Sequence, residues 1–242
     1  MNKSKDFNKV KDYFATNIED YCKSSPMGST TIDGMMTINE HKTILTYLQY
    51  VLNNNIKGDI VEFGCYGGST SIAIKKLLKT NNSNKKLYVY DSFEGLPKNH
   101  PNDNISSNCK GSMASSLETY KDNITKNNCD PINITKGYFA DIKESQLPDN
   151  IAFAFYDGDL YQSTLDFLNK VKDKMTKGSI IVFDDYIHPA GIFPGTKIAC
   201  TEYFGSDKKV KFVGNNNLLD IEDDFYYVDS SSVSQGIYEI KQ

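Results

Sequence analysis

The sequence predicts an α/β protein with a doubly wound, mostly parallel sheet and a helical N-terminal extension. Short apolar strands alternate with amphipathic helices through the middle of the chain, which is typical of open parallel sheets. The segments 151–157 and 179–185 are almost continuously apolar, as strands covered on both faces are. A glycine-rich turn also joins the first strand of the series to the helix that follows it.

Before the series, residues 5–23 have the apolar spacing of an amphipathic helix, and a polar stretch of residues 24–33 follows. We therefore expect residues 1–33 to form a helical extension and residues 34–242 to form one domain. A second helix is predicted over 38–52, where Ile44, Leu45 and Leu48 share a face.

The remaining elements follow in order, with one long polar interruption. Strands are predicted at 58–64, 86–91, 132–139, 151–157 and 179–185, helices at 69–80, 113–124 and 161–175, and weak strands at 211–213, 225–228 and 237–240. The polar segment 92–112 is long for a loop without structure of its own, so it is either a lid over a site or a loop without a role.

Composition excludes several classes of protein. The chain of 242 residues carries a net charge of −4, and all of its 27 basic residues are lysines, with no basic stripe for nucleic acid. The five cysteines are widely spaced and odd in number, which disfavours a zinc site or a disulfide framework. There is no signal-peptide pattern and no apolar run of the roughly 18 residues that a membrane span requires. We expect a cytoplasmic protein without a membrane span.

The first candidate site is the turn VEFGCYGGST and the strand that follows. Gly64, Gly67 and Gly68 allow a ligand to approach the backbone before a helix N-terminus, although the spacing is not that of the G-x-G-x-x-G dinucleotide motif. Asp91 ends the next strand, where a carboxylate accepts hydrogen bonds from ribose hydroxyls in nucleotide-binding folds. Together they predict an adenosine-containing ligand without choosing the cofactor.

The second candidate site is a set of aspartates at the ends of two apolar strands. Asp157 closes one strand, with Asp159 two residues on, and Asp184 and Asp185 close the next. Adjacent parallel strands would bring these carboxylates to one edge of the sheet, where they would repel one another and raise one another's pKa unless a bound cation relieved the repulsion. Ligands that are all oxygen favour Mg²⁺, Ca²⁺ or Mn²⁺. The alternative is that Asp159 and Asp185 cap helices or face solvent.

Four motifs in this order, VEFGCYGGS, YDSFEGLP, YDGDLYQST and FDDY, resemble the TylF/MycF family of macrocin-type O-methyltransferases. The resemblance covers residues 34–205 and implies a Rossmann-like class I methyltransferase domain. It implies an enzyme that uses S-adenosylmethionine (SAM) and Mg²⁺ to methylate a sugar hydroxyl.

The resemblance also implies roles for individual residues. The methionine part of SAM would be held by Met36, Thr37, Glu62, Gly64, Tyr66, Gly68 and Ser69, the ribose by Asp91 and Ser92, and the adenine by Tyr138, Phe139 and Asp141. Asp157, Asp184 and Asp185 match the metal ligands. For the base that accepts the hydroxyl proton, Asp157 is the local candidate and His188 the next. Tyr161 is a candidate for stacking on a sugar.

Three other functions stay open from the sequence: a catechol-type O-methyltransferase, an NAD-dependent oxidoreductase on a similar sheet, and a binding protein without turnover. The missing G-x-G-x-x-G and the surplus of carboxylates disfavour the second, and the intact metal ligands disfavour the third. The expected partner is a small sugar-type acceptor. A homo-oligomer with an N-terminal helix contact is a further possibility.

Overall fold

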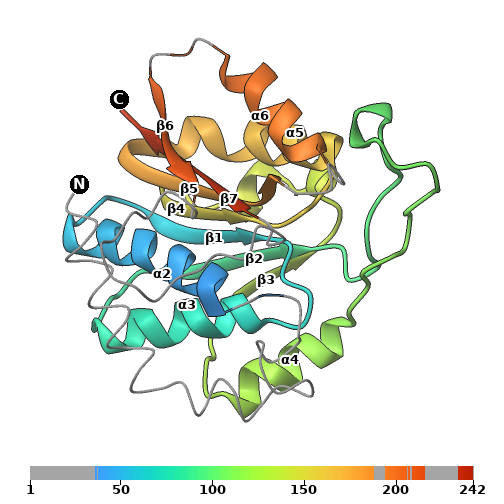
Figure 1. Ribbon diagram of the computed structural model, residues 1–242. Helices are drawn as coiled ribbons and strands as arrows, with labels where there is room; N and C mark the ends of the chain where they lie inside the picture. The colour runs from blue at the N-terminus through green and yellow to red at the C-terminus, as the bar shows by residue number, and fades with distance from the viewer. Residues whose placement is uncertain are drawn as a thin grey trace, which may run out of the picture.

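The computed structural model describes residues 36, 38–187, 194–205, 207, 209–215 and 234–241, and its centre is a seven-stranded sheet of order β3-β2-β1-β4-β5-β7-β6 (Figure 1). The strands are β1 (Asp59–Phe63), β2 (Leu87–Asp91), β3 (Asn133–Lys136), β4 (Ile151–Tyr156), β5 (Met175–Ile187), β6 (Val210–Asn215) and β7 (Ser234–Ile240). Strands β1 to β5 pair in parallel, whereas β7 runs antiparallel to both β5 and β6. The predicted fold class is confirmed.

Helices cover both faces of the sheet because its central strands are apolar on both sides. On one face lie α2 (Ile38–Asn53), α3 (Ser69–Thr80) and α4 (Leu117–Lys126), and on the other lie α5 (Tyr161–Val171) and α6 (Gly195–Phe204) (Figure 1). Successive residues of β1 alternate between the two cores: Ile60 packs in the core under α2 and α3, and Val61 packs in the core under α5. The continuous apolar runs that predicted buried strands therefore fill two separate cores.

The largest differences from the predicted helix boundaries are at the start of α4 and at the end of α5. α4 begins at Leu117 instead of residue 113, because the Ser116 side chain accepts a hydrogen bond from the backbone N–H of Thr119 and caps the helix there. α5 ends at Val171, and after a short 3-10 turn the chain enters β5 at Met175, which pairs with Ile151 of β4. Strand pairing overrides the helical spacing at this point.

Several predictions lie outside the described residues. These are the helix at 5–23, and with it the boundary of the 1–33 extension, and the weak strand at 225–228. The weak strands at 211–213 and 237–240 are confirmed as β6 and β7, which extend the parallel sheet with an antiparallel pair.

The 92–112 segment has structure of its own. Its two arms pair through hydrogen bonds from Leu96 N–H to the Ser112 carbonyl and from Gly111 N–H to the Leu96 carbonyl, each 2.9 Å. A 3-10 turn, η1 (Pro101–Asp103), lies near its middle, and the Asp103 side chain is fully buried. The segment is therefore an ordered loop that leaves the sheet edge after β2, with hydrogen bonds between its two arms.

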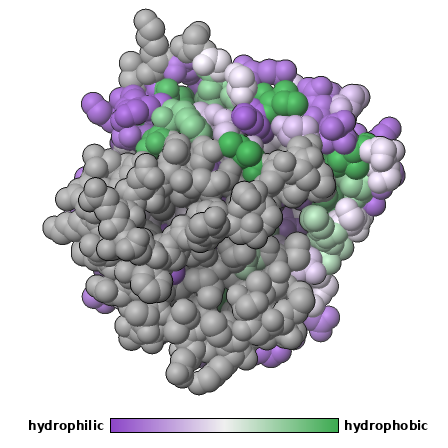
Figure 2. All heavy atoms as spheres, in the orientation of Figure 1, coloured by the Kyte–Doolittle hydropathy of each residue, from purple (hydrophilic) through white to green (hydrophobic). Residues whose placement is uncertain are grey.

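On the face shown in Figure 2, the coloured upper edge mixes hydrophilic residues with single hydrophobic ones and shows no continuous apolar patch. Within the described ranges, the exposed large hydrophobic side chains are Met113 and Phe212. No helix in that part of the chain is long and apolar enough to cross a membrane.

Candidate active site

A cavity of about 380 Å³ opens where the parallel strands end. It is lined by residues that follow β1, β2, β3 and β4 and by two residues near the end of β5, together with residues from α2, from α5 and from the 92–112 segment. Seven of its lining side chains are carboxylates: Glu40, Asp91, Asp157, Asp159, Asp166, Asp184 and Asp185. Lys98 is the one basic residue among the described residues that line it, so the cavity favours ligands with positive charge.

The turn after β1 forms one end of the cavity and requires glycine. Gly64 has φ of 87°, and a Cβ at this position would overlap the carbonyl oxygen of Asp157. Gly68, with φ of 93°, precedes the first residue of α3 and donates its N–H to the Cys65 carbonyl at 2.7 Å. The chain thus brings two strand ends into direct contact and leaves backbone groups facing the cavity.

Asp91 ties the end of β2 to this turn. One carboxylate oxygen accepts hydrogen bonds from the backbone N–H groups of Cys65 at 2.8 Å and Tyr66 at 3.3 Å. The other accepts from Phe93 N–H at 2.7 Å. The side chain is half-buried and lines the cavity, and the oxygen that accepts from Phe93 N–H keeps a lone pair for a further donor.

Three aspartates meet where β4 and β5 end. One carboxylate oxygen from each of Asp157, Asp184 and Asp185 lies within 4.8 Å of the others. Gln235 of β7 donates its side-chain amide to Asp184 at 2.9 Å, which orients that carboxylate. Burial, and then the charge of the neighbouring aspartates, raises the pKa of Asp157 and of Asp184 well above the usual carboxyl value. The cluster therefore has the composition of a site for a hard divalent cation.

Two further carboxylates extend this acidic region: Asp159, which the sequence places beside the predicted cluster without assigning it a role, and Glu40, which the sequence does not single out. Asp159 is 6% exposed and lines the cavity, and burial, followed by the neighbouring Asp185 carboxyl group, raises its pKa well above the usual carboxyl value. Asp159 is the last residue of the YDGD motif, and that position is the sequence feature that points to it. Glu40 enters from α2 and raises the pKa of Asp157 and Asp184 through its charge. Nothing in the α2 sequence distinguishes Glu40 from a surface residue.

Four cavity residues that are not glycine have positive φ. These are Tyr66 at 43° after β1, Met113 at 55° beyond the 92–112 segment, Asp159 at 58° after β4, and Asp185 at 48° near the end of β5. Each such residue costs on the order of 1–3 kcal/mol, and strain of this kind is concentrated at functional sites. The left-handed backbone conformation of these residues directs their side chains toward the cavity.

The structure divides the predicted SAM residues into two groups. Gly64, Tyr66, Asp91, Ser92, Tyr138 and Phe139 line the cavity, whereas Met36, Glu62, Gly68, Ser69 and Asp141 are not among its lining residues. The Glu62 carboxylate is fully buried and accepts a hydrogen bond from the Ser71 hydroxyl at 2.5 Å, behind the glycine turn. Thr37 and His188 lie outside the described residues.

Tyr161 has partners other than the cavity. Its ring stacks on the His100 ring with centroids 4.6 Å apart, and its hydroxyl donates to Glu202 at 2.6 Å. Tyr161 does not line the cavity, so the candidate role of stacking on a sugar stays unsupported. The neighbouring residues of α5, Gln162, Ser163 and Asp166, do line it.

Comparison with known proteins identifies the family. Residues 3–213 match the family described as macrocin O-methyltransferase (TylF). The chain is 28% identical over 203 residues to demethyldecarbamoylnovobiocin O-methyltransferase of Streptomyces niveus, covering 80% of this chain and 74% of that protein. It is 30% identical over 155 residues to 8-demethyl-8-(2,3-dimethoxy-alpha-L-rhamnosyl)-tetracenomycin-C 4'-O-methyltransferase of Streptomyces olivaceus, covering 59% of each. The structure of the O-methyltransferase NovP superposes over all of both chains with a TM-score of 0.70 at 19% identity.

Proposed function

Since the chain belongs to the macrocin O-methyltransferase (TylF) family and is an O-methyltransferase, we propose that it transfers the methyl group of SAM, with a divalent cation, to a hydroxyl of a sugar carried by a small molecule. The family is SAM-dependent. The feature of this chain that best supports the proposal is the cluster of Asp157, Asp184 and Asp185 beside the glycine turn in one cavity.

The charge of the cavity fits SAM better than NAD. SAM carries a sulfonium and an ammonium group, which are both attracted to a cavity lined by seven carboxylates and one lysine. The diphosphate of NAD would meet strong repulsion in the same place, and the turn lacks the G-x-G-x-x-G spacing that cradles a diphosphate. The NAD-dependent oxidoreductase is therefore disfavoured on two independent grounds.

We assign the cofactor to the sheet edge. The backbone of the Gly64–Tyr66 turn would hold the methionine part, Asp91 and Ser92 the ribose, and Phe139 the adenine ring. All six of these residues line one cavity, at the edge where open α/β sheets bind ligands. SAM supplies an activated methyl group, so the protein's own task is to align the acceptor oxygen and exclude water.

Asp157, Asp184 and Asp185 would hold the cation. Three carboxylates that lie within 4.8 Å of one another fit a hard cation such as Mg²⁺, and the burial and mutual repulsion that raise the pKa of Asp157 and Asp184 are relieved by such a charge. A divalent cation held there would supply positive charge that lowers the pKa of a nearby acceptor hydroxyl. Gln235 keeps Asp184 in place for this role.

The proton of the acceptor hydroxyl must pass to a base. Asp157 is the candidate that the sequence indicates, and Asp159 becomes a second because it lines the cavity without belonging to the three-carboxylate cluster. Burial raises the pKa of Asp159 above the usual carboxyl value, which makes it a stronger base than an exposed carboxylate. Comparing Asp157→Asn with Asp159→Asn separates these roles, since only the first removes a proposed cation ligand.

The proposed acceptor is a glycoside, because one relative is named for methylating a rhamnosyl group. The test is release of S-adenosylhomocysteine (SAH) from SAM with demethyldecarbamoylnovobiocin, methyl α-L-rhamnopyranoside or the catechol caffeate, with MgCl₂ or EDTA. We expect release with a glycoside, and its abolition by EDTA and by Asp184→Asn, but not by the exposed control Asp122→Asn. Release with caffeate alone would replace the sugar by a catechol, and release that survives EDTA would overturn the role of the cation.

A further inference from the structure

The 92–112 segment supplies a wall of the cavity that the sheet does not. Residues 95–98 and Met113, which directly follows the segment's arm pairing, line the cavity, and we call them the acceptor wall. The wall offers the apolar side chains Leu96, Pro97 and Met113 and the ammonium of Lys98. The sheet edge provides the proposed places for SAM and the cation, so this wall is the surface left for the acceptor.

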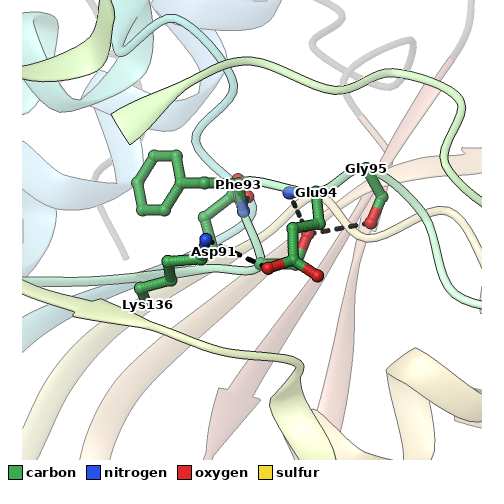
Figure 3. A network of polar contacts seen from close by, with 6 residues as sticks. Asp91, Phe93, Glu94, Gly95 and Lys136 are labelled. Carbon is green, nitrogen blue, oxygen red and sulfur yellow. Dashed lines mark hydrogen bonds and ion pairs between the residues drawn. The ribbon is translucent and has the colours of Figure 1, made fainter. Parts of the chain in front are cut away.

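The root of the segment is fixed to the sheet. Ser92 donates its hydroxyl to the Gly95 carbonyl at 2.8 Å and accepts from Glu94 N–H at 3.0 Å, so the chain turns sharply after β2. Lys136 at the end of β3 forms an ion pair of 3.0 Å with Glu94 (Figure 3). This network sets the direction in which residues 95–98 leave the sheet, but it does not reach the middle of the segment.

The middle of the segment is held by Asp103. One carboxylate oxygen accepts a hydrogen bond of 2.6 Å from the backbone N–H of Tyr161, the first residue of α5, and the other accepts one of 2.6 Å from His100 N–H. A Cβ at Gly195, the first residue of α6, would overlap the Asp103 carboxylate. Asp103 is fully buried between the N-terminal ends of the two helices.

Two independent features make this an anchor and not a chance contact. The helix N-termini carry positive partial charge and free N–H groups, so they favour a buried carboxylate. The His100 ring, three residues before Asp103, also stacks on the Tyr161 ring at 4.6 Å. The Asp103 anchor joins the segment to α5 two residues after Asp159, so it places the acceptor wall relative to the acidic cluster.

We propose that Asp103 is a positioning residue, which holds the 92–112 segment so that the acceptor wall binds the acceptor beside the carboxylate cluster. The identity of the wall's ligand rests on the proposed function, whereas the anchoring does not. Loss of the anchor releases the wall and leaves the sheet-edge places for SAM intact. Acceptor binding is then lost more than SAM binding.

The test compares Asp103→Ala, Asp103→Asn and the wild type. Ser107→Ala is the matched control, since Ser107 is exposed in the same segment. In Asp103→Ala we expect amide hydrogen exchange across 97–110 to rise about ten- to a hundredfold, the effect of losing hydrogen bonds to a charged group. Calorimetric binding of SAH should stay within about twofold, which also shows that the variant is folded.

Steady-state kinetics of the Asp103 variants test whether the anchor affects acceptor binding more than turnover. With whichever of demethyldecarbamoylnovobiocin and methyl α-L-rhamnopyranoside the wild type methylates, KM for the acceptor should rise at least about tenfold, with a smaller change in kcat. Asp103→Asn retains an acceptor for the Tyr161 N–H and should recover part of both effects. Unchanged exchange in Asp103→Ala would overturn the anchor. Faster exchange with an unchanged acceptor KM, or with weakened SAH binding instead, would overturn the acceptor wall.

The two proposals fail in different ways. If the wild type methylates neither glycoside, the proposed sugar acceptor fails, while hydrogen exchange and SAH binding still decide whether Asp103 anchors the segment.

Discussion

Asp184 is the residue on which the proposed cation site depends most, because it is 8% exposed and oriented by Gln235. We expect Asp184→Asn to reduce turnover by about a hundredfold or more, since a neutral amide weakens cation binding. SAM affinity should change by less than about twofold, because Asp184 belongs to β5, which β4 separates from β1 and its glycine turn. Steady-state kinetics and calorimetry measure the two effects separately.

The control for this prediction is Asp122→Asn, which makes the same chemical change at an exposed position of α4. An equal loss of turnover in the two variants would contradict the cation site. So would an Asp184→Asn variant whose turnover equals that of the wild type both in excess MgCl₂ and in EDTA.

Gly64 is the residue at which backbone geometry and ligand binding coincide. In Gly64→Ala the new methyl group would overlap the Asp157 carbonyl, and φ of 87° is itself unfavourable for alanine. We expect the free energy of unfolding to fall by about 2–4 kcal/mol. SAM binding should also fall, because the turn and the Asp157 strand end must separate. Urea unfolding and calorimetry are the measurements.

Gly111→Ala is the matched comparison, since Gly111 also has positive φ (82°) but has only one distant neighbour around the position of a Cβ. It should cost about 1 kcal/mol from backbone strain alone and leave SAM binding unchanged. A Gly64→Ala variant as stable as Gly111→Ala would show that the strand ends are further apart than described.

At the scale of elements, α5 is held to the sheet by an aromatic cluster. The Phe167 ring lies 5.0 Å from Phe63, 4.9 Å from Tyr156 and 5.7 Å from Phe183, one contact with each of β1, β4 and β5. Phe167→Ala should therefore lower the free energy of unfolding by about 3–5 kcal/mol, because the cavity left among three rings cannot collapse easily.

Phe212→Ala provides the reference for this prediction. Phe212 of β6 is 43% exposed, although it contacts Tyr186 and Tyr238. Its loss should cost less than half as much, because less apolar area is withdrawn from water at this position. Urea unfolding of both variants would reveal the opposite order if α5 were held mainly by its polar contacts.

At the scale of the whole molecule, ligand binding should stabilise the fold, since the cavity joins elements from both halves of the sheet. SAM at about 100 times its Kd adds roughly 2.7 kcal/mol, which corresponds to a rise in Tm of about 5–10 °C for a domain of this size. NAD should give no rise. Thermal unfolding with SAM or NAD, each with and without MgCl₂, makes the comparison.

A rise with SAM that MgCl₂ increases in the wild type but not in Asp184→Asn would support both the cofactor and the cation site. A rise in Tm with NAD and none with SAM would instead favour the NAD-dependent oxidoreductase.

Local patterns were sufficient for the fold. The strands and helices from 38 to 187 were predictable because each carries its own apolar period, and because β–α alternation leaves few topologies. The errors fall at boundaries such as the start of α4, where one capping hydrogen bond from Ser116 decides the first residue. A boundary depends on a single contact, whereas an element depends on many.

For the site, the sequence alone determined the residues that follow the strands. Gly64, Asp91, Asp157, Asp184 and Asp185 come together because parallel strands end at one edge, whatever the surrounding loops do. Only the tertiary structure decided that Glu40 of α2 joins them, that Glu62 lies behind the cavity, and that Asp103 is buried against α5 and α6. These placements depend on contacts between segments far apart in the chain, and no local period records such contacts.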